Sequence, residues 1–491
     1  MNRKWFAAIL LLVAVCACGV ALADDTDTNG PYTYSVKDDG TIIITKFSWS
    51  QNKKADVYIP SMIDGYTVTE IGEEAFAKGC YTTGNYGYSY RKECDIKVVL
   101  PDTVTRIGGK AFFDAGITEI NIPESVQYIG PAAFSDCQFL HFIVSKTHPY
   151  FAVIDKALYS KKDRELLWYP YFYLEKTDLV IPEGIVSIGD YALYRCYSYD
   201  NPNRESHRVV LPSTLKHIGN YAFSSGIFEI GPGVSFLPEG LEDIGESAFY
   251  RTEFYAYARQ DAVITFPSSL VSIGKKCFQE SKTRNYVRGA TGSYMVTVVI
   301  PADTSITVIP YGAFQDCDMD IRLYADSLER IEDYGFSTDY FYSDGGRWGH
   351  HGILYPCDSQ GNIDYGVFRN VEYIGKYGLS HKDKTKNECV VAGGDPSGFR
   401  AKITEINSNF DFPVLIPSSV QKIAANAYTN AVMDYYLPET LSDISPQAFP
   451  RGSTFVVEAG SYAEHWAAEN VFEYAVIGVS EEDDLSWLNG E

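Results

Sequence analysis

The sequence lacks several features that would each have indicated a particular chemistry. It has ten cysteines but no C-x-x-C pair, and its eight histidines show no zinc-ligand spacing, so no metal site is predicted. The eight cysteines beyond residue 23 are too sparse for a disulfide-dense miniprotein. No apolar run beyond the N-terminus approaches the ~20 residues of a membrane-spanning helix, so no transmembrane span is expected.

Basic residues are also scarce. The 491 residues include 41 Lys and Arg against 64 Asp and Glu, which gives a formal net charge of −23. Such a chain repels phosphate backbones, and nucleic acid is therefore excluded as an expected partner. Hydrophobic residues make up 45% and charged residues 21%, which is the composition of a folded, soluble protein.

The N-terminus has the pattern of an export signal. Arg3 and Lys4 precede an apolar stretch over residues 5–15, and Ala21-Leu22-Ala23 forms an A-x-A cleavage site. A competing site exists, because Val15-Cys16-Ala17-Cys18 resembles a loose bacterial lipobox with a lipid anchor at Cys18. Both alternatives predict an exported protein that is secreted or held at the cell surface.

A repeated motif dominates the chain. It reads h-x-h-P-x-x-h-x-x-I-G-x-x-A-F, where h is apolar, and about twelve copies can be traced. Pro101 and Pro123 of adjacent copies are 22 residues apart, within the range of leucine-rich repeats. The residues before the proline predict a short strand that the proline ends, Ile-Gly predicts a tight bend, and Ala-Phe is expected to fill the coil. One coil buries too little apolar surface to offset its lost chain entropy, so the coils must stack.

These copies resemble the BspA-like leucine-rich repeat family of bacterial surface and secreted proteins. The clearest are Leu100-Pro101…Ile107-Gly108…Ala111-Phe112 and Ile122-Pro123…Ile129-Gly130…Ala133-Phe134, and the resemblance extends from about residue 31 to residue 475. It implies a mainly β, right-handed solenoid of about 12 coils with short strands, insertions and a short C-terminal helix.

The resemblance also implies a function without catalysis or cofactor. The expected role is binding of a protein or glycan ligand on another cell or matrix, in adhesion or host contact. Two alternatives stay open: a structural cell-envelope protein with no dedicated ligand, and a carbohydrate-active enzyme that stacks sugars on tyrosine-rich loops.

The predicted layout has five parts. A signal peptide covers residues 1–23, and residues 24–56 form a linker and an N-terminal capping hairpin that turns at Asp39-Gly40. The repeat array with its insertions covers residues 57–455. Residues 456–479 form a C-terminal cap with a helix, for which Ser461 and Glu464 supply a capping box. Residues 480–491 are expected to be an acidic disordered tail.

The cysteines are predicted to be mainly core residues. Cys80, Cys137, Cys196 and Cys317 recur at one repeat position, which indicates small buried side chains. Cys80/Cys94 and Cys357/Cys389 flank insertions, and disulfides at these two pairs are an alternative in an oxidising location. No catalytic residue stands out, because the carboxylates are too many to single out a glycosidase pair.

One column of the repeat indicates an interaction surface. Residues two before each proline are expected to point outward from the strands, yet most of them are apolar. An exposed apolar stripe edged by charge is typical of an interaction surface. The alternative is that β-branched residues are kept there for strand propensity. The predicted column is Tyr58, Val99, Asn121, Val180, Val210, Phe236, Thr265, Val299, Leu415 and Tyr436.

Overall fold

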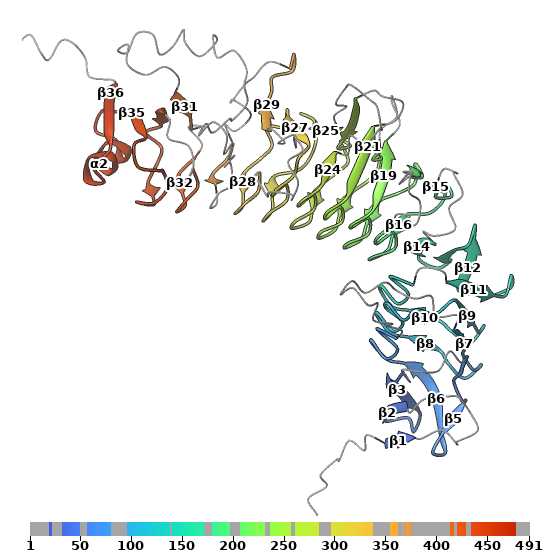
Figure 1. The fold of residues 1–491 in the computed structure, drawn as a ribbon. Coiled ribbons are helices and arrows are strands. Elements are labelled where there is room, and N and C mark those ends of the chain that lie inside the picture. Colours follow the sequence, from blue (N-terminus) through green and yellow to red (C-terminus); the bar gives the residue numbers. More distant parts are fainter. Residues whose placement is uncertain are drawn as a thin grey trace, which may run out of the picture. The chain divides into compact units, whose positions relative to one another are not determined.

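Strands dominate the computed structural model, as the sequence predicts, and α2 (Tyr462–Glu469) is the one helix among the described residues. The chain divides into two units, Met1–Lys162 and Asp163–Glu491, and each is described by itself. Within each unit, the strands of successive coils lie side by side (Figure 1). The structure describes residues 19–21, 32–49, 56–79, 96–137, 140–170, 179–196, 207–230, 236–256, 261–283, 296–336, 354–361, 367, 370–374, 413–416, 420–428 and 434–477.

Unit 1 has two sheets and a hairpin. One sheet has the strand order β1-β2-β3-β6-β8-β10 with β5 beside β6, the second has the order β11-β9-β7-β4, and β12 pairs antiparallel with β13. The bounds are β1 (Gly19–Ala21), β2 (Tyr32–Val36), β3 (Ile42–Phe47), β4 (Val57–Tyr58), β5 (Met62–Ile63), β6 (Tyr66–Ile71), β7 (Lys97–Val99), β8 (Arg106–Ile107), β9 (Glu119–Ile122), β10 (Tyr128–Ile129), β11 (His141–Val144), β12 (Phe151–Ile154) and β13 (Ala157–Ser160).

Unit 2 has five runs of parallel strands. Their orders are β14-β16-β18-β20-β23, β15-β17-β19-β21-β24, β22-β25-β27-β29, β26-β28-β30-β32-β34 and β31-β33-β35-β36. The bounds are β14 (Glu165–Trp168), β15 (Leu179–Val180), β16 (Ser187–Ile188), β17 (His207–Val210), β18 (His217–Ile218), β19 (Ile227–Ile230), β20 (Asp243–Ile244), β21 (Glu253–Ala256), β22 (Ala262–Thr265), β23 (Ser272–Ile273), β24 (Lys282–Thr283), β25 (Val296–Ile300), β26 (Val308–Ile309), β27 (Asp320–Leu323), β28 (Arg330–Ile331), β29 (Leu354–Pro356), β30 (Tyr373–Ile374), β31 (Pro413–Leu415), β32 (Lys422–Ile423), β33 (Asp434–Leu437), β34 (Asp443–Ile444), β35 (Thr454–Glu458) and β36 (Glu473–Ile477).

Each regular coil contributes two short parallel strands, one more than the sequence predicts. The strand expected before the proline is present, as in β7 and β9. The pair of residues that ends in the isoleucine of Ile-Gly forms a second strand, so that β8 pairs with β10 through Ile107 and Ile129. The predicted bend at Ile-Gly is therefore wrong. The chain turns later, where Lys110 and Asp114 on either side of Ala-Phe have left-handed φ angles of 52° and 55°.

The glycine of Ile-Gly permits the coils to approach each other closely. A Cβ on Gly130 would lie 2.5 Å from the backbone nitrogen of Gly109 in the preceding coil. One on Gly219 would lie 2.7 Å from the backbone nitrogen of Asp190. A side chain at Gly130 or Gly219 would therefore overlap the backbone of the preceding coil.

The phenylalanines of Ala-Phe form a buried stack in each unit. Adjacent rings have nearly parallel planes and lie face to face along the array. In unit 1 the centroids of Phe76, Phe112 and Phe134 are 5.0 and 5.5 Å apart. In unit 2 the successive separations along Phe223, Phe249, Phe278, Phe314 and Phe336 are 5.1, 4.8, 5.5 and 5.4 Å. Burial of each ring stabilises its coil by about 1.5–3 kcal/mol.

The position three residues after the phenylalanine is reserved for small side chains that bind the preceding coil. Thr252 Oγ1 donates a hydrogen bond to the carbonyl of Phe223 at 2.9 Å, and Ser281 Oγ donates to that of Phe249 at 2.6 Å. These buried hydroxyls thus add a second connection from coil to coil beside the ring stack.

The predicted burial of the cysteines is confirmed where the structure describes them. Cys137, Cys196 and Cys317 are buried free thiols at this small-residue position. Cys357 is likewise buried and free. Because Cys357 is free, the Cys357/Cys389 disulfide alternative is not borne out. Cys80 and Cys94 lie outside the described residues, so the disulfide alternative at that pair is not tested.

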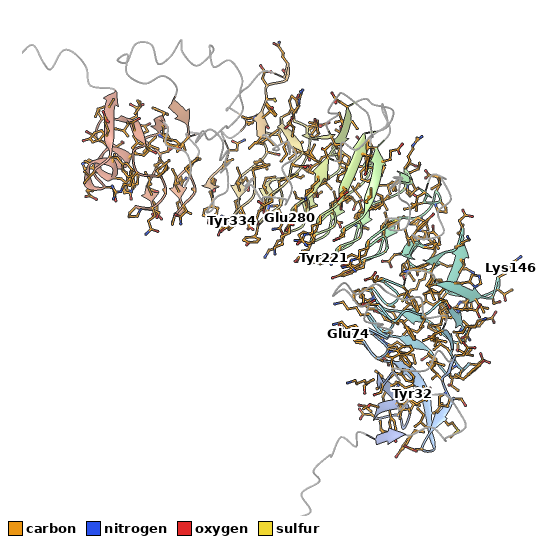
Figure 2. The ribbon with its side chains drawn as sticks, in the orientation of Figure 1. Tyr32, Glu74, Lys146, Tyr221, Glu280 and Tyr334 are labelled. Atoms are coloured by element: carbon orange, nitrogen blue, oxygen red, sulfur yellow. The ribbon has the colours of Figure 1, made fainter. Side chains whose placement is uncertain are left out.

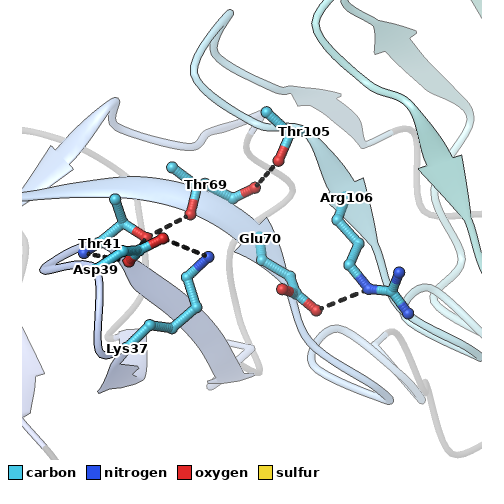
Figure 3. A network of polar contacts seen from close by, with 7 residues as sticks. All are labelled: Lys37, Asp39, Thr41, Thr69, Glu70, Thr105 and Arg106. Atoms are coloured by element: carbon cyan, nitrogen blue, oxygen red, sulfur yellow. Dashed lines mark hydrogen bonds and ion pairs between the residues drawn. The ribbon is translucent and has the colours of Figure 1, made fainter.

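The segment near the N-terminus forms a hairpin at the position that the sequence predicts. β2 and β3 pair antiparallel, and Gly40 in the turn has a φ of 76°. Hydroxyl groups connect this hairpin to the next coils (Figure 3): Thr69 Oγ1 donates to Thr41 Oγ1 at 2.9 Å, and Thr105 Oγ1 donates to the Thr69 carbonyl at 3.2 Å. Arg106 Nε, 3.1 Å from Glu70 Oε1, forms an ion pair beside them.

A buried histidine anchors the inserted β12–β13 hairpin. His148 Nδ1 accepts hydrogen bonds from the backbone N–H groups of Tyr150 at 3.1 Å and Phe151 at 3.2 Å. The ring proton is therefore assigned to Nε2, which donates to the Pro123 carbonyl at 2.9 Å. Burial lowers the pKa of His148, so the neutral ring is the form that fits the fold.

The predicted C-terminal helix is confirmed as α2. Ser461 Oγ accepts a hydrogen bond from the Glu464 N–H at 3.1 Å, and the Glu464 carboxylate accepts one from the Gly460 N–H at 2.6 Å. Trp466 on α2 is buried against Phe449 and Phe455, with ring centroids 5.8 and 5.6 Å apart. The helix thereby covers the last phenylalanine of the stack.

Several predicted segments lie wholly or partly outside the described residues. They are most of the signal peptide with Cys18, the linker at residues 24–31 and the tail at residues 480–491. Within the predicted signal peptide, β1 pairs antiparallel with β2. Residues 375–412 are also outside, so the count of about twelve coils stays a prediction.

We expect Gly130→Ala to lower the free energy of unfolding by about 1–3 kcal/mol, because the new methyl group overlaps the backbone of the preceding coil. Urea denaturation followed by circular dichroism measures this loss. Gly109→Ala is the matched control: its methyl group would meet nothing closer than 3.4 Å, and a change below about 0.5 kcal/mol is expected. Equal losses in the two variants would contradict the close-approach argument.

We expect acid to weaken the packing of His148. Its folded pKa is depressed below the unfolded value of about 6.5, so its contribution is complete above that pH and is lost as the pH falls through the folded pKa. The charge of Glu124 opposes the depression, and that of Lys161 adds to it. Denaturation of the wild type and His148→Gln between pH 7.5 and 5 should show a smaller pH dependence in the variant. Parallel curves for the wild type and His148→Gln would refute the assignment.

Candidate interaction surface

The structure brings three members of the predicted column together in unit 1. Tyr58 on β4 lies opposite Val99 on β7. The register between β7 and β9 places Asn121 next to Val99. Asn121 in turn lies opposite Ile143 on β11. These side chains therefore form one continuous row across four adjacent strands.

Three of the four side chains in this row are exposed. The exposed fractions are 54% for Tyr58, 37% for Val99 and 50% for Ile143. Sequence reasoning missed Ile143 because Ser145 stands where the motif would have its proline. The missed signal is the spacing, since Ile143 follows Asn121 by 22 residues, the period of the repeat. We call Tyr58, Val99 and Ile143 the apolar row.

The side chain of Asn121 stabilises the row through hydrogen bonds and is not left free for a ligand. Its Oδ1 accepts a hydrogen bond from the Leu100 N–H at 2.7 Å, and its Nδ2 donates to the Leu100 carbonyl at 2.9 Å. Both ends of the amide are thus engaged with the chain just after β7, and the side chain is half-buried. It holds two coils together between Val99 and Ile143.

A charged row runs beside the apolar row on the same strands. Lys97 Nζ lies 3.3 Å from Glu119 Oε1, and His141 Nδ1 lies 3.9 Å from Glu119 Oε2. Exposed ion pairs of this kind stabilise a fold by at most about 1 kcal/mol each. They do give the apolar row a polar border, which favours specificity in binding.

The unit 2 members of the column form separate short groups. Val180 is 54% exposed and lies level with the half-buried Val210. Thr265 and Val299 lie opposite each other and are half-buried, and the exposed Arg322 continues their row. This row is therefore interrupted by charge and is less apolar than the row of unit 1.

The prediction that Phe236 faces outward is wrong. Its exposed fraction is 6%, and its ring packs against Phe223, Phe249 and Phe254 at centroid distances of 6.2, 6.0 and 6.0 Å. The residue lies in a bend rather than a strand, so the alternation of inward and outward side chains does not apply. The bend lets the ring join the core stack.

The last two members lie near the C-terminal cap. Leu415 ends β31 opposite Tyr436 on β33, and its side chain is outside the described part. Tyr436 is half-buried, and its hydroxyl donates to Glu458 Oε1 at 2.7 Å. Burial and this hydrogen bond raise the pKa of Tyr436. Tyr436 is thus committed to a contact within its own coil stack.

Burial shifts the pKa values of several titratable groups in unit 2. Burial raises the pKa of the Cys196 thiol to about 12, which leaves it protonated and a poor nucleophile. Burial also raises the pKa of Glu165 and of Asp318 to about 7, with Asp163 and Asp190 adding to the effect at Glu165. Glu165 on β14 and Asp318 before β27 belong to different coils.

Among the described residues, no three side chains of the His, Cys, Asp or Glu type are grouped so that they could hold a metal ion. No helix within the same residues combines the length and apolar character needed to cross a membrane.

Known structures of similar fold were found. A leucine-rich repeat protein from Bacteroides ovatus is 17% identical, with 91% of this chain and 98% of that chain covered and a TM-score of 0.36. A leucine rich cell surface protein from Faecalibacterium prausnitzii is 16% identical, with coverages of 94% and 96% and a TM-score of 0.34. The pneumococcal vaccine antigen PcpA is 16% identical, with coverages of 73% and 94% and a TM-score of 0.30. A search of curated proteins gave no match.

The repeat itself is matched by a family model. The model is described as a BspA type leucine rich repeat region, and it occurs in six copies over residues 83–162, 169–287 and 203–341. These ranges include more than half of the chain, and they contain the Ile-Gly and Ala-Phe positions that join the coils. The chain belongs to the BspA-type leucine-rich repeat family.

Proposed function

We propose that this protein is exported and acts without catalysis, as a rigid surface that binds a protein or glycan ligand in adhesion or host contact. The apolar row of unit 1 is the observation that supports this function best. Three large apolar side chains on neighbouring strands face solvent in one register, beside a row of paired charges. A soluble protein gains nothing for its own stability from such exposure, which favours a role in recognition.

The scaffold suits binding for a second reason. The apolar row stands on strands whose neighbours are fixed by backbone hydrogen bonds, and the Asn121 amide clamps the end of β7. A ligand that docks there would order few protein groups, so little binding free energy is lost to conformational entropy. The border of Lys97, Glu119 and His141 offers both a donor and acceptors for polar contacts.

The proposed layout follows the sequence. A signal peptide at residues 1–23 is removed, or Cys18 carries a lipid anchor, and the array at residues 57–455 lies between the two caps. The exported chain loses Arg3 and Lys4 with the signal peptide, so its net charge is −23 − 2 = −25. This charge and the acidic tail keep it soluble and away from polyanionic partners.

The test begins with arrays of extracellular-matrix proteins and of glycans, probed with the purified protein without residues 1–23. For each specific binder, the dissociation constant is then measured by biolayer interferometry. We expect Tyr58→Ser/Ile143→Ser to weaken binding by about tenfold or more, because two exposed apolar contacts are lost.

Val271→Ser is the matched control. Val271 is 60% exposed but lies in unit 2, outside the apolar row, and its variant should bind like the wild type. Equal binding by the double variant and the wild type would remove the apolar row from the proposal. The absence of any specific binder at micromolar concentrations would favour a structural cell-envelope protein.

A further inference from the structure

A second surface, on unit 2 and independent of the apolar row, combines stacked tyrosines with carboxylates. Tyr191 and Tyr221 occupy the same position of adjacent coils, because each directly precedes the alanine of its repeat. Both side chains are half-buried. Their ring centroids are 4.8 Å apart with an interplanar angle of 13°, and Tyr194 meets Tyr191 edge-on at 5.3 Å. This arrangement presents aromatic rings at the turn edge of the coils, where Figure 2 shows Tyr221.

Two carboxylates beside these rings have no cationic partner among the described residues. Asp190 accepts hydrogen bonds only from neutral donors, the N–H and the amide nitrogen of Asn220, at 2.7 and 3.3 Å. The carboxylate of Glu246, in the next coil, is exposed and has no hydrogen-bond or ion-pair partner among the described residues. We call Tyr191, Tyr221, Asp190 and Glu246 the tyrosine edge.

These carboxylates make the electrostatic potential at the Tyr191 ring more negative. Burial raises the pKa of Tyr191 to about 12, and Asp190 and Glu246 contribute to the increase together with the neighbouring tyrosines. The same potential that disfavours a tyrosinate favours a cation over the ring face.

The same surface contains a filled version of this arrangement. Arg251 lies over the ring of Tyr250, with 5.1 Å between its guanidinium carbon and the ring centroid. Its Nε and Nη2 also donate to the Glu280 carboxylate of the next coil at 2.7 and 3.3 Å. Aromatic ring, guanidinium and carboxylate of the following coil thus form a complete unit, with Glu280 on the same edge as Tyr221 (Figure 2).

The tyrosine edge has two of these three parts. Tyr221 supplies the ring and Glu246 of the following coil supplies the carboxylate, but none of the described arginines completes the unit. The cations nearby already have partners: Arg251 pairs with Glu280, Arg195 lies over Tyr194 at 5.3 Å, and Lys276 lies over Tyr311 at 5.8 Å.

We propose that the tyrosine edge binds an arginine side chain from an arginine-rich segment of a partner protein. The guanidinium would stack on an aromatic face and donate to Glu246 and Asp190, as Arg251 does within the chain. The net charge of −23 steers such a basic segment towards this protein.

The test uses a fluorescein-labelled hexa-arginine peptide with the full chain, measured by fluorescence anisotropy at about 0.15 M salt, where exposed charges are screened beyond ~8 Å. We expect Tyr191→Leu/Tyr221→Leu to weaken binding by about tenfold and Glu246→Gln by about fivefold. Hexa-lysine should bind more weakly than hexa-arginine, because an ammonium group cannot stack as a planar guanidinium does. Circular dichroism verifies that the variants fold, and Glu246→Gln alters no contact of the core.

Two matched controls separate this site from diffuse charge attraction. Glu329→Gln removes one exposed carboxylate elsewhere in unit 2, and Tyr311→Leu/Tyr334→Leu removes a tyrosine pair that Lys276 already faces. Both should keep wild-type affinity for hexa-arginine. Equal losses in the controls, equal affinity for hexa-lysine, or no binding at millimolar peptide would overturn the proposal.

Other outcomes are equally distinct. A glycan that loses binding in Tyr191→Leu/Tyr221→Leu, while hexa-arginine binding is unchanged, would assign the tyrosine edge to sugars and overturn the proposal. The Tyr58→Ser/Ile143→Ser variant should bind hexa-arginine like the wild type. A result against ligand binding by the apolar row can therefore be distinguished from a result against arginine binding by the tyrosine edge.

Discussion

The close approach of one coil to the next is the constraint on which the whole structure depends. The backbone N–H of Phe112 donates to the Ala133 carbonyl at 2.8 Å, and that of Phe223 donates to the Ala248 carbonyl at 2.8 Å. These bonds form only at a separation that leaves no room for a side chain at Gly130. The same separation puts the phenylalanine rings in stacking contact. Coil stability is therefore a property of neighbouring pairs, as expected for repeat arrays.

This constraint also determines how surfaces arise. Residues at the same position of consecutive repeats become neighbours whatever their distance along the chain. Tyr58 and Val99 are 41 positions apart and still lie opposite each other, because the intervening insertion leaves the register of β4 and β7 intact. Tyr191 and Tyr221 stack for the same reason. A few substitutions at one repeat position can thus create a binding surface without any change in the core.

The two proposed surfaces would bind their ligands through different kinds of interaction. The apolar row offers flat, exposed hydrophobic area with a border of paired charges, whereas the tyrosine edge offers aromatic faces beside carboxylates that lack a cation. Neither requires the other, since they lie on different units. Both are held by contacts between stacked coils, as expected in a family of repeat proteins.

The repeat period, the stacked Ala-Phe core, the D-G hairpin and the capped helix at Ser461 could be predicted from the sequence, because each depends on local residue type and spacing. The second strand at Ile-Gly could not, since only the neighbouring coil shows that Gly130 serves close approach rather than a bend. The burial of Phe236, the amide clamp of Asn121 and the place of Ile143 in the row were likewise decided by contacts between coils. Periodicity specifies what each coil contains, but the identity of its neighbour decides which side chains remain exposed to a ligand.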